Sequence, residues 1–112
     1  FNLQNAKLHS DVIIVEGSID AMFVHQAGFS NVVSSLGAAI PKSQINLLKK
    51  YFDKIIIFSD NDEAGEHMKH AILDACSGKE LYTVELPADK KDAGEMTQEQ
   101  IIKAITNKTI HI

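Results

Sequence analysis

Short apolar runs alternate along the chain with segments of helical periodicity. The β-branched run at residues 11–15 is typical of a strand buried on both faces of a sheet. Residues 31–34 predict a second short strand, and residues 54–58 predict a third, buried strand. Residues 80–86 alternate between apolar and polar positions and predict a fourth strand. Residues 109–112 are either a short edge strand or a stub. This pattern predicts a chain of strands separated by longer polar or amphipathic segments.

The segments between these runs carry helix start and stop signals. The first predicted helix begins with Ser18 as N-cap and stops at Gly28, and within it apolar residues recur at helical spacing. Pro41 starts the second helix, which extends to residue 51, and a third begins near residue 63 and extends to about 77 before Gly78. Thr97, with Gln100 three residues on, caps a last helix that ends near residue 107. Strands that alternate with helices predict βαβ units. The fold class is therefore α/β, with a mainly parallel four-stranded sheet and helices on both faces.

Acidic residues lie shortly after three of these predicted strands. Glu16 comes after the first strand and Asp60 and Asp62 come after the third, while Asp89 and Asp92 follow the fourth. The carboxyl ends of parallel strands lie at one edge of the sheet, where α/β folds bind their ligands. Converging carboxylates repel one another, and a divalent cation removes that repulsion. Oxygen-only ligands suit Mg²⁺ or Mn²⁺. Acids are also common in exposed loops, and Asp62 is equally well placed as the N-cap of the following helix.

The charge of the chain limits the functions open to it. The 112 residues have a net charge of −4, and all 11 basic residues are Lys. A free-standing DNA-binding protein normally takes its phosphate affinity from Lys and Arg, so neighbouring domains or metal ions would have to supply positive charge here. Neither a P-loop motif nor GxGxxG occurs in the chain. No run is long enough to span a membrane, and the single cysteine, Cys76, fits a reducing cytoplasm.

The ordered motifs of the chain resemble those of the Toprim domain of bacterial DnaG-type primases and their phage and plasmid relatives. The matching motifs are Val15-Glu16-Gly17 with Asp20, Gly28, Ser35-Leu36-Gly37, Asp60-Asn61-Asp62-Glu63-Ala64-Gly65, Leu86-Pro87 and Lys91-Asp92. The resemblance covers nearly all of the chain and implies a Toprim (Rossmann-like) fold over residues 10–112. Residues 1–9 are similar to the segment that leads into this domain from a preceding one, which suggests a fragment of a larger protein.

The resemblance also implies roles for individual residues. Glu16 matches a glutamate proposed as general acid or base and as metal ligand, and Asp60 and Asp62 match a metal-binding pair. We expect Asp20 and Asp92 to be outer members of the metal site. Primases commonly carry another acid two residues after the position of Asp92, but Gly94 stands there in this chain. This difference puts an additional metal position in doubt.

A further position concerns substrate rather than metal. Lys91 lies beside Asp92 in the last motif and is a candidate contact for incoming nucleotide or template. The alternative for Lys91 is a solvated loop position.

The function implied by the resemblance is Mg²⁺-dependent nucleotidyl transfer that makes RNA primers from nucleoside triphosphates on a single-stranded DNA template. A replicative helicase is an expected partner, the cytoplasm is the expected location, and no membrane is involved. The alternatives are a Toprim-type nuclease, which would use the same acids, and a non-catalytic recruitment module. The isolated chain is expected to bind Mg²⁺ or Mn²⁺ weakly and to have little polymerase activity.

Overall fold

The computed structural model describes residues 11–111 except 36–39, 41 and 91, so the predicted leader at 1–9 and the prediction for Lys91 lie outside the described residues. The elements in chain order are β1 (Asp11–Val15), α2 (Ser18–Gln26), β2 (Val32–Ser34), α3 (Lys42–Tyr51), β3 (Lys54–Ile57), α4 (Glu63–Ala75), β4 (Glu80–Thr83), the 3-10 helix η1 (Ala93–Glu95), α5 (Gln98–Thr106) and β5 (Thr109–His111). The predicted α/β class is confirmed.

The sheet has five strands in the order β2-β1-β3-β4-β5. The first four strands are parallel, and β5 pairs antiparallel with β4. The four predicted strands are thus present, and the segment left open between edge strand and stub forms the fifth strand. Because β1 and β3 are direct neighbours, the loops that follow them leave the sheet side by side.

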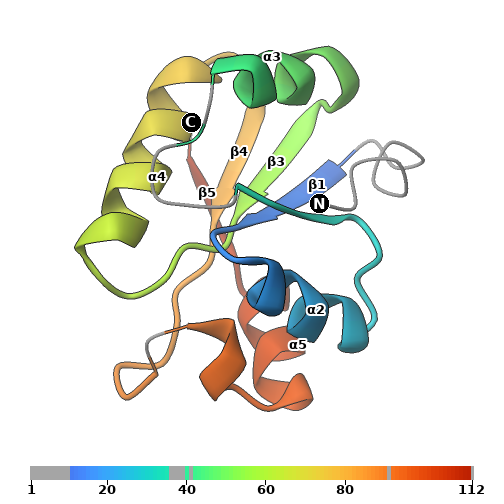
Figure 1. The fold of residues 1–112 in the computed structure, drawn as a ribbon, viewed down its shortest axis with the longest axis vertical. Coiled ribbons are helices and arrows are strands. Elements are labelled where there is room, and N and C mark those ends of the chain that lie inside the picture. Colours follow the sequence, from blue (N-terminus) through green and yellow to red (C-terminus); the bar gives the residue numbers. More distant parts are fainter. Residues whose placement is uncertain (1–10, 36–39, 41, 91, 112) are drawn as a thin grey trace.

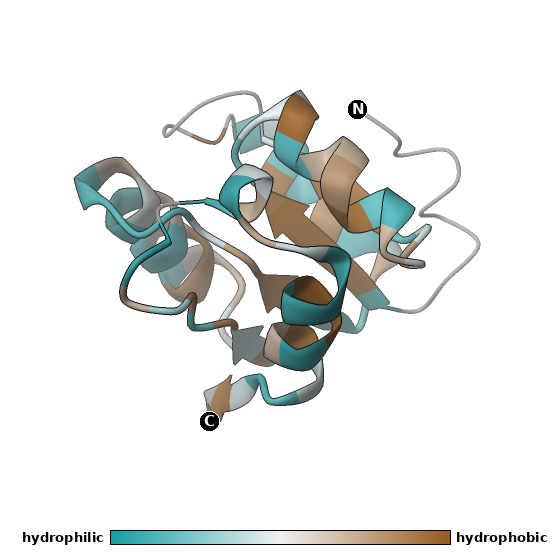
Figure 2. Ribbon diagram, turned by 90° about the horizontal axis from the view of Figure 1, so that it is seen from below, coloured by the Kyte–Doolittle hydropathy of each residue, from teal (hydrophilic) through white to brown (hydrophobic). Residues whose placement is uncertain are grey.

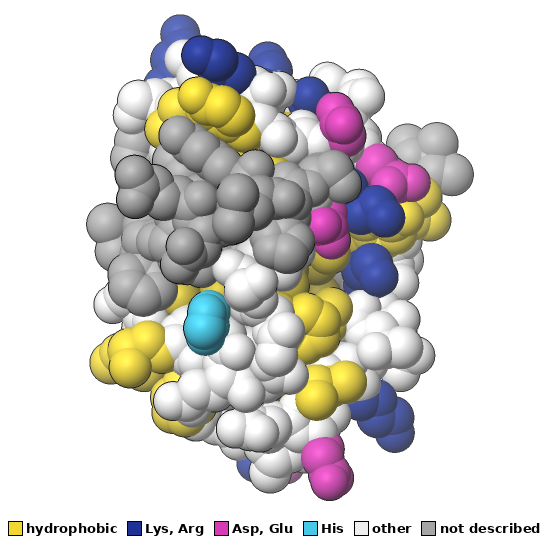
Figure 3. Space-filling model, turned by 90° about the vertical axis from the view of Figure 1, so that its right-hand side faces the viewer, with side chains coloured by type: hydrophobic (Ala, Val, Ile, Leu, Met, Phe, Trp, Pro, Cys, Tyr) yellow, Lys and Arg dark blue, Asp and Glu magenta, His cyan; other side chains and the backbone are white. Residues whose placement is uncertain are grey.

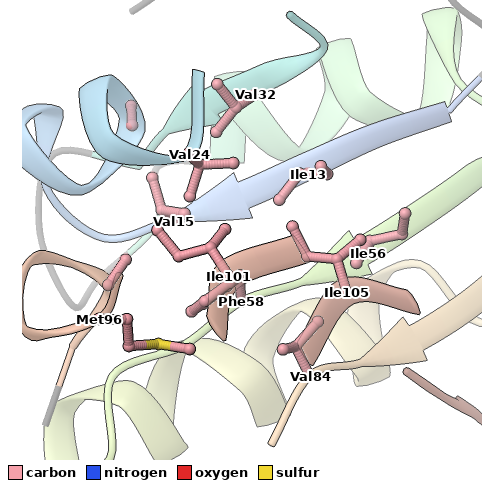
Figure 4. Close-up of a cluster of buried hydrophobic side chains, with 12 residues drawn as sticks. Ile13, Val15, Val24, Val32, Ile56, Phe58, Val84, Met96, Ile101 and Ile105 are labelled. Carbon is pink, nitrogen blue, oxygen red and sulfur yellow. The ribbon is translucent and has the colours of Figure 1, made fainter. Parts of the chain in front are cut away.

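Helices cover both faces of the sheet, α3 and α4 on one and α2 and α5 on the other (Figure 1). Side chains of β1 alternate between the two sides, so that Val12 and Ile14 pack with α3 and α4 while Ile13 and Val15 pack with α2 and α5. Figure 4 shows the second of these cores, in which Val24 from α2 and Ile101 from α5 point toward the strands. A strand buried on both faces needs apolar residues at successive positions, which explains the unbroken run in β1.

Hydropathy follows the same layers. In Figure 2 the strands at the centre are largely hydrophobic, and α5 turns a hydrophilic side outward. Within the described ranges, no helix combines the length and the apolar character needed to cross a bilayer.

The helix ends agree with the sequence prediction at some positions and differ at others. Thr97 and Gln100 form a complete capping box at the start of α5. Ser18 is wrong as the N-cap of α2, because Gly17 occupies that position in an extended conformation and Ser18 is the first helical residue. Gly28 follows the last turn of α2 with φ 111°, a left-handed conformation that glycine adopts at little cost.

Candidate metal centre

Three carboxylates meet at the carboxyl ends of two adjacent strands. Glu16 directly follows β1, and Asp60 and Asp62 lie in the turn between β3 and α4. One oxygen from each of the three lies within 4.8 Å of the others. The three residues predicted as the centre of the site are therefore brought together, although Glu16 stands 44 positions before Asp60 in the chain.

A hydrogen bond fixes the separation of the two loops. Oε1 of Glu16 accepts from the backbone N–H of Asp60 at 3.1 Å. On the other side, the hydroxyl of Ser34 at the end of β2 donates to the backbone carbonyl of Glu16 at 3.0 Å. Glu16 is only 9% exposed, so its side chain is held by its surroundings. Both contacts place the Glu16 carboxylate in a defined position beside Asp60.

Asp62 has a structural function as well as its place in the carboxylate group. Its side chain caps α4 by accepting from the backbone N–H of Gly65 at 2.7 Å. Both interpretations of Asp62 left open by the sequence therefore agree with the geometry, because one oxygen can accept the capping bond while the carboxylate remains near Glu16 and Asp60.

Gly65 is required by the close approach of the Asp60 carbonyl group and the Glu16 carboxylate. A Cβ at this position would lie 2.0 Å from the carbonyl oxygen of Asp60 and 2.8 Å from Oε1 of Glu16. At these distances the Asp60 backbone or the Glu16 carboxylate would have to shift. The glycine thus lets α4 start directly against the carboxylates.

The two outer acids, Asp20 and Asp92, lie beside this group. Asp20 in the first turn of α2 accepts hydrogen bonds from the backbone of Gly17 and Gly94, and Asp92 precedes η1. Their charges act on Asp60, but they are outside the group of three that meets the distance limit for a shared ion. Their role as metal ligands stays a prediction. Gly94, which stands where an acid was expected, supplies a backbone N–H to Asp20 instead.

Crowding of negative charge changes the proton affinity of the site. Burial, followed by the charges of Asp20, Glu16, Asp62 and Asp92, raises the pKa of Asp60 to about 7. Burial and the charge of Asp92 also raise the pKa of Asp20, and the backbone hydrogen bonds partly oppose this. A bound cation would offset the repulsion, and a set of carboxylate oxygens suits Mg²⁺ or Mn²⁺. The residues present therefore fit a divalent hard metal ion.

A hollow of about 490 Å³ opens next to Asp60, between α4 and the segment after β4. Its lining residues are Ser59, Asp60, Asn61, Glu66, Lys69, Val84, Glu85, Leu86 and Ala88. Lys69 was not identified from the sequence, where its helical spacing from Asp62 and Glu66 was the available signal. Its ammonium lies 2.9 Å from Oε1 of Glu66. Asp89, by contrast, does not join the carboxylate group among the described residues, and its Oδ2 lies 4.0 Å from Nζ of Lys90.

The described Lys side chains on the face in Figure 3 lie near its edges. Several are at the top, and those on the right lie beside acidic side chains. A nucleic acid would therefore find little phosphate-binding surface on this face of the described part of the chain.

Comparisons with known proteins show which family the chain belongs to. The Toprim-like family model matches residues 13–110. The chain is 39% identical over 89 residues to the DNA primase of Clostridium acetobutylicum, covering 78% of this chain and 15% of that protein. It is 44% identical over 77 residues to the DNA primase of Aquifex aeolicus, covering 67% of this chain and 16% of that protein.

The fold comparison gives the same result. The crystal structure of the Aquifex aeolicus primase, which contains zinc-binding and RNA polymerase domains, superimposes with a TM-score of 0.80 at 33% identity, over 99% of this chain and 30% of that one. The chain thus spans less than a third of the proteins it matches here. It belongs to the Toprim-like family, and its relatives identify it as a Toprim domain of the DnaG primase type.

Proposed function

We propose that this chain is the metal-binding catalytic domain of a DNA primase, which makes RNA primers from nucleoside triphosphates on single-stranded DNA. The observation that carries the proposal is the group of Glu16, Asp60 and Asp62, whose oxygens lie within 4.8 Å at the carboxyl edge of a primase-type Toprim sheet. Because the chain spans 15% of the length of a curated primase, the activity belongs to the complete polypeptide and is itself part of the proposal.

The three carboxylates would hold Mg²⁺ or Mn²⁺. When bound, such an ion neutralises triphosphate charge and lowers the pKa of the attacking 3′-hydroxyl. In the transfer, the 3′-oxygen bonds to the α-phosphorus of the nucleotide and pyrophosphate leaves. Glu16 is the group we expect to take the hydroxyl proton, because it is held rigidly beside Asp60. Asp20 and Asp92 keep the surroundings negative and so favour a cation.

The hollow beside Asp60 is the place we assign to the nucleotide. Asp60 of the carboxylate group lines it together with the polar Asn61 and Lys69 and the apolar Val84 and Leu86. One Lys among several acids gives little affinity for phosphate without a cation. We therefore expect the isolated chain to bind metal weakly, to bind nucleotide only with metal, and to have little or no polymerase activity.

Cleavage of phosphodiesters would use the same carboxylates, and a recruitment surface would not need them. The primase relatives favour synthesis over cleavage. A replicative helicase as partner, the cytoplasm as location, residues 1–9 as a leader from a preceding domain and Lys91 as a contact to nucleotide or template remain predictions that accompany the proposal.

The test combines a binding and an activity measurement. Calorimetric titration of the chain with Mn²⁺ should show binding that the double variant Asp60→Ala with Asp62→Ala weakens by at least about tenfold. Asp89→Ala is the matched control, since Asp89 is an acid of the same rim outside the group. Unchanged binding in the double variant would show that the site is wrongly assigned.

The activity measurement uses the complete polypeptide with single-stranded DNA, labelled nucleoside triphosphates and Mg²⁺. Primer synthesis should occur in the wild type and in Asp89→Ala, and should fall to background in the double variant. Cleavage of labelled DNA without primer synthesis would replace the primase assignment by that of a nuclease. If neither synthesis nor cleavage were detected, the recruitment module would be favoured.

A further inference from the structure

Helix α3 has a charge of opposite sign to the net charge of the chain. It carries Lys42, Lys49 and Lys50 and no acid, whereas α4 carries three acids and one Lys, and the chain as a whole has a net charge of −4. No Asp or Glu occurs in residues 21–52. The Lys side chains at the top edge in Figure 3 lie at the end of the molecule where Figure 1 shows α3. Among the described helices, α3 is thus the basic one.

The three Lys of α3 share one exposed side of the helix. All three are exposed, and so is Asn46 between them. Positions 42, 46, 49 and 50 recur at the spacing of one helix face, and the buried Leu48 lies on the opposite side, against the core. In the part of the chain that the structure describes, none of these Lys forms an ion pair with an acid. The outer side of α3 therefore carries positive charge that the domain does not neutralise.

Helix stability alone does not account for this charge. Lys49 and Lys50 in the last turn complement the negative end of the helix dipole. Lys42, however, is in the first turn, where the dipole disfavours a positive charge, and no acid is present in that turn to offset it. A ligand with negative charges along its length would interact favourably with all three.

Helix α3 extends from one edge of the sheet to the other. Its first turn is held at the carboxyl edge, because the amide of Gln44 donates to the backbone carbonyl of Ser34 at 2.9 Å. The hydroxyl of Ser34 in turn donates to the backbone carbonyl of Glu16. The last turn leads to the start of β3 at the opposite edge. The three Lys span about 12 Å along the helix, so a strand bound to them would lead toward the carboxylate group.

An exposed aromatic ring stands at the far end of this row of Lys. Tyr51 is 38% exposed, and Nζ of Lys50 lies 5.3 Å from the centroid of its ring. Sites for single-stranded nucleic acid combine a row of cations, which contact the phosphates, with aromatic rings on which bases stack. An acidic peptide would have no use for the ring. The outer side of α3 thus has the composition of a single-strand contact.

We propose that the outer side of α3, formed by Lys42, Lys49 and Lys50 with Tyr51 at its end, binds single-stranded DNA through its phosphates and leads it toward the carboxylate group. The inference rests on the proposed function, since it assigns a contact to the template that a primase copies. It gives the domain a phosphate-binding surface despite its negative net charge. Lys contacts to phosphates carry no sequence information, so this binding is independent of base sequence.

A binding experiment on the complete polypeptide tests this contact. Fluorescence anisotropy of a labelled oligothymidylate, without metal or nucleotide, gives the affinity at several salt concentrations. The triple variant Lys42→Gln, Lys49→Gln and Lys50→Gln keeps good helix formers and removes three charges. We expect it to bind at least about tenfold more weakly at about 0.1 M salt, and the slope of log affinity against log salt to fall by about 2.

A matched control removes three Lys from the other face of the sheet. Lys103 is on α5, and Lys54 and Lys108 lie over the ring of Tyr82, which packs on the core of that face. Lys54→Gln, Lys103→Gln and Lys108→Gln together should weaken DNA binding less than about threefold, because distant charges are screened by salt. No loss in the α3 variant, or equal losses in the two variants, would overturn the proposal. A larger loss for duplex than for single-stranded DNA would also overturn it.

The reactivity of the Lys amines locates the DNA without substitutions. Reductive methylation followed by peptide mass spectrometry gives the rate at each Lys in the free and the DNA-bound polypeptide. Saturating DNA should slow Lys42, Lys49 and Lys50 at least about threefold, because a neighbouring phosphate favours the charged, unreactive ammonium form. Lys103 should be unaffected. If the three Lys of α3 already react slowly without DNA, an acidic surface of the protein itself covers them and the proposal is wrong.

These measurements do not depend on catalysis. Weaker DNA binding by the α3 variant of a polypeptide that makes no primers would refute the proposed function and leave the α3 contact standing. Primer synthesis combined with unchanged DNA binding in the α3 variant would refute the α3 contact alone.

Discussion

Oε1 of Glu16 accepts a hydrogen bond from the backbone N–H of Asp60 at 3.1 Å, and this bond joins the loops that follow two neighbouring strands. It means that Glu16 both contributes negative charge to the site and sets the position of a second carboxylate. The two functions can be separated by substitution, because an amide oxygen can accept the same hydrogen bond without the charge.

Glu16→Gln should therefore preserve the fold and weaken metal binding. We expect the free energy of unfolding to change by less than about 0.5 kcal/mol, since the bond from Asp60 is kept, and Mn²⁺ affinity to fall at least about tenfold. Glu16→Ala removes the acceptor as well and should cost about 1 to 2 kcal/mol. Urea unfolding and calorimetry give the two quantities. An unaltered Mn²⁺ affinity in Glu16→Gln would exclude Glu16 as a ligand.

Asp62→Asn should likewise separate capping from metal binding. Asn is as good an N-cap as Asp, so the bond to Gly65 and the stability of α4 should be nearly unchanged while metal affinity falls. Asp62→Ala should lose the cap in addition, at a cost of about 1 kcal/mol. Thermal unfolding with and without Mn²⁺ measures both effects. If Asn and Ala destabilise the metal-free chain equally, Asp62 does not cap α4 in solution.

Gly65→Ala should damage the site by steric conflict. The added Cβ would lie 2.0 Å from the carbonyl oxygen of Asp60, so the start of α4 or the Asp60 loop must shift. We expect a loss of about 2 to 4 kcal/mol and of Mn²⁺ binding. Gly78→Ala is the control, because φ of 98° strains alanine there but a Cβ meets no atom within 4 Å. It should cost about 1 kcal/mol and leave Mn²⁺ binding intact.

The raised pKa of Asp60 predicts that protons and metal compete. Since burial and the neighbouring carboxylates bring this pKa to about 7, Asp60 is largely protonated at pH 6 in the metal-free chain. Apparent Mn²⁺ affinity should therefore rise from pH 6 to pH 8, and calorimetry in buffers of different ionisation enthalpy should detect proton release on binding. Affinity that does not vary over this range would mean that Asp60 is already ionised.

The same shift sets the sign of a stability effect. Because the folded-state pKa of about 7 lies above the ordinary value of 3.8, the folded chain binds more protons than the unfolded chain between these values. The stability of the metal-free chain should thus decrease as pH rises from about 4 to 7. Asp60 is partly exposed and solvent screens its interactions, so we expect a total on the order of 1 kcal/mol. Asp60→Asn should flatten this dependence, and saturating Mn²⁺ should reverse it.

The sequence by itself determined the elements of this fold and the identity of the central acids. Unbroken β-branched runs such as 11–15 can only be buried on both faces of a sheet, and the Thr97 capping box depends on residues three positions apart. Glu16, Asp60 and Asp62 stood out because each follows a strand, and parallel strands end at one edge. Such signals are local or follow from strand direction alone, so they can be recognised in the sequence without knowledge of the tertiary contacts.

Only the tertiary structure decided how these parts meet. The sheet order, which places β1 beside β3, brings Glu16 to Asp60, and the packing of η1 on α2 lets Gly94 bind Asp20. Their spacing allows Ile19 and Met22 to form a helix face that packs on the core. In the structure, however, Ala21 and Val24 are buried against the sheet, and Ile19 and Met22 are exposed. Helical periodicity shows that residues share a face, but which face is buried depends on the neighbours that the fold provides.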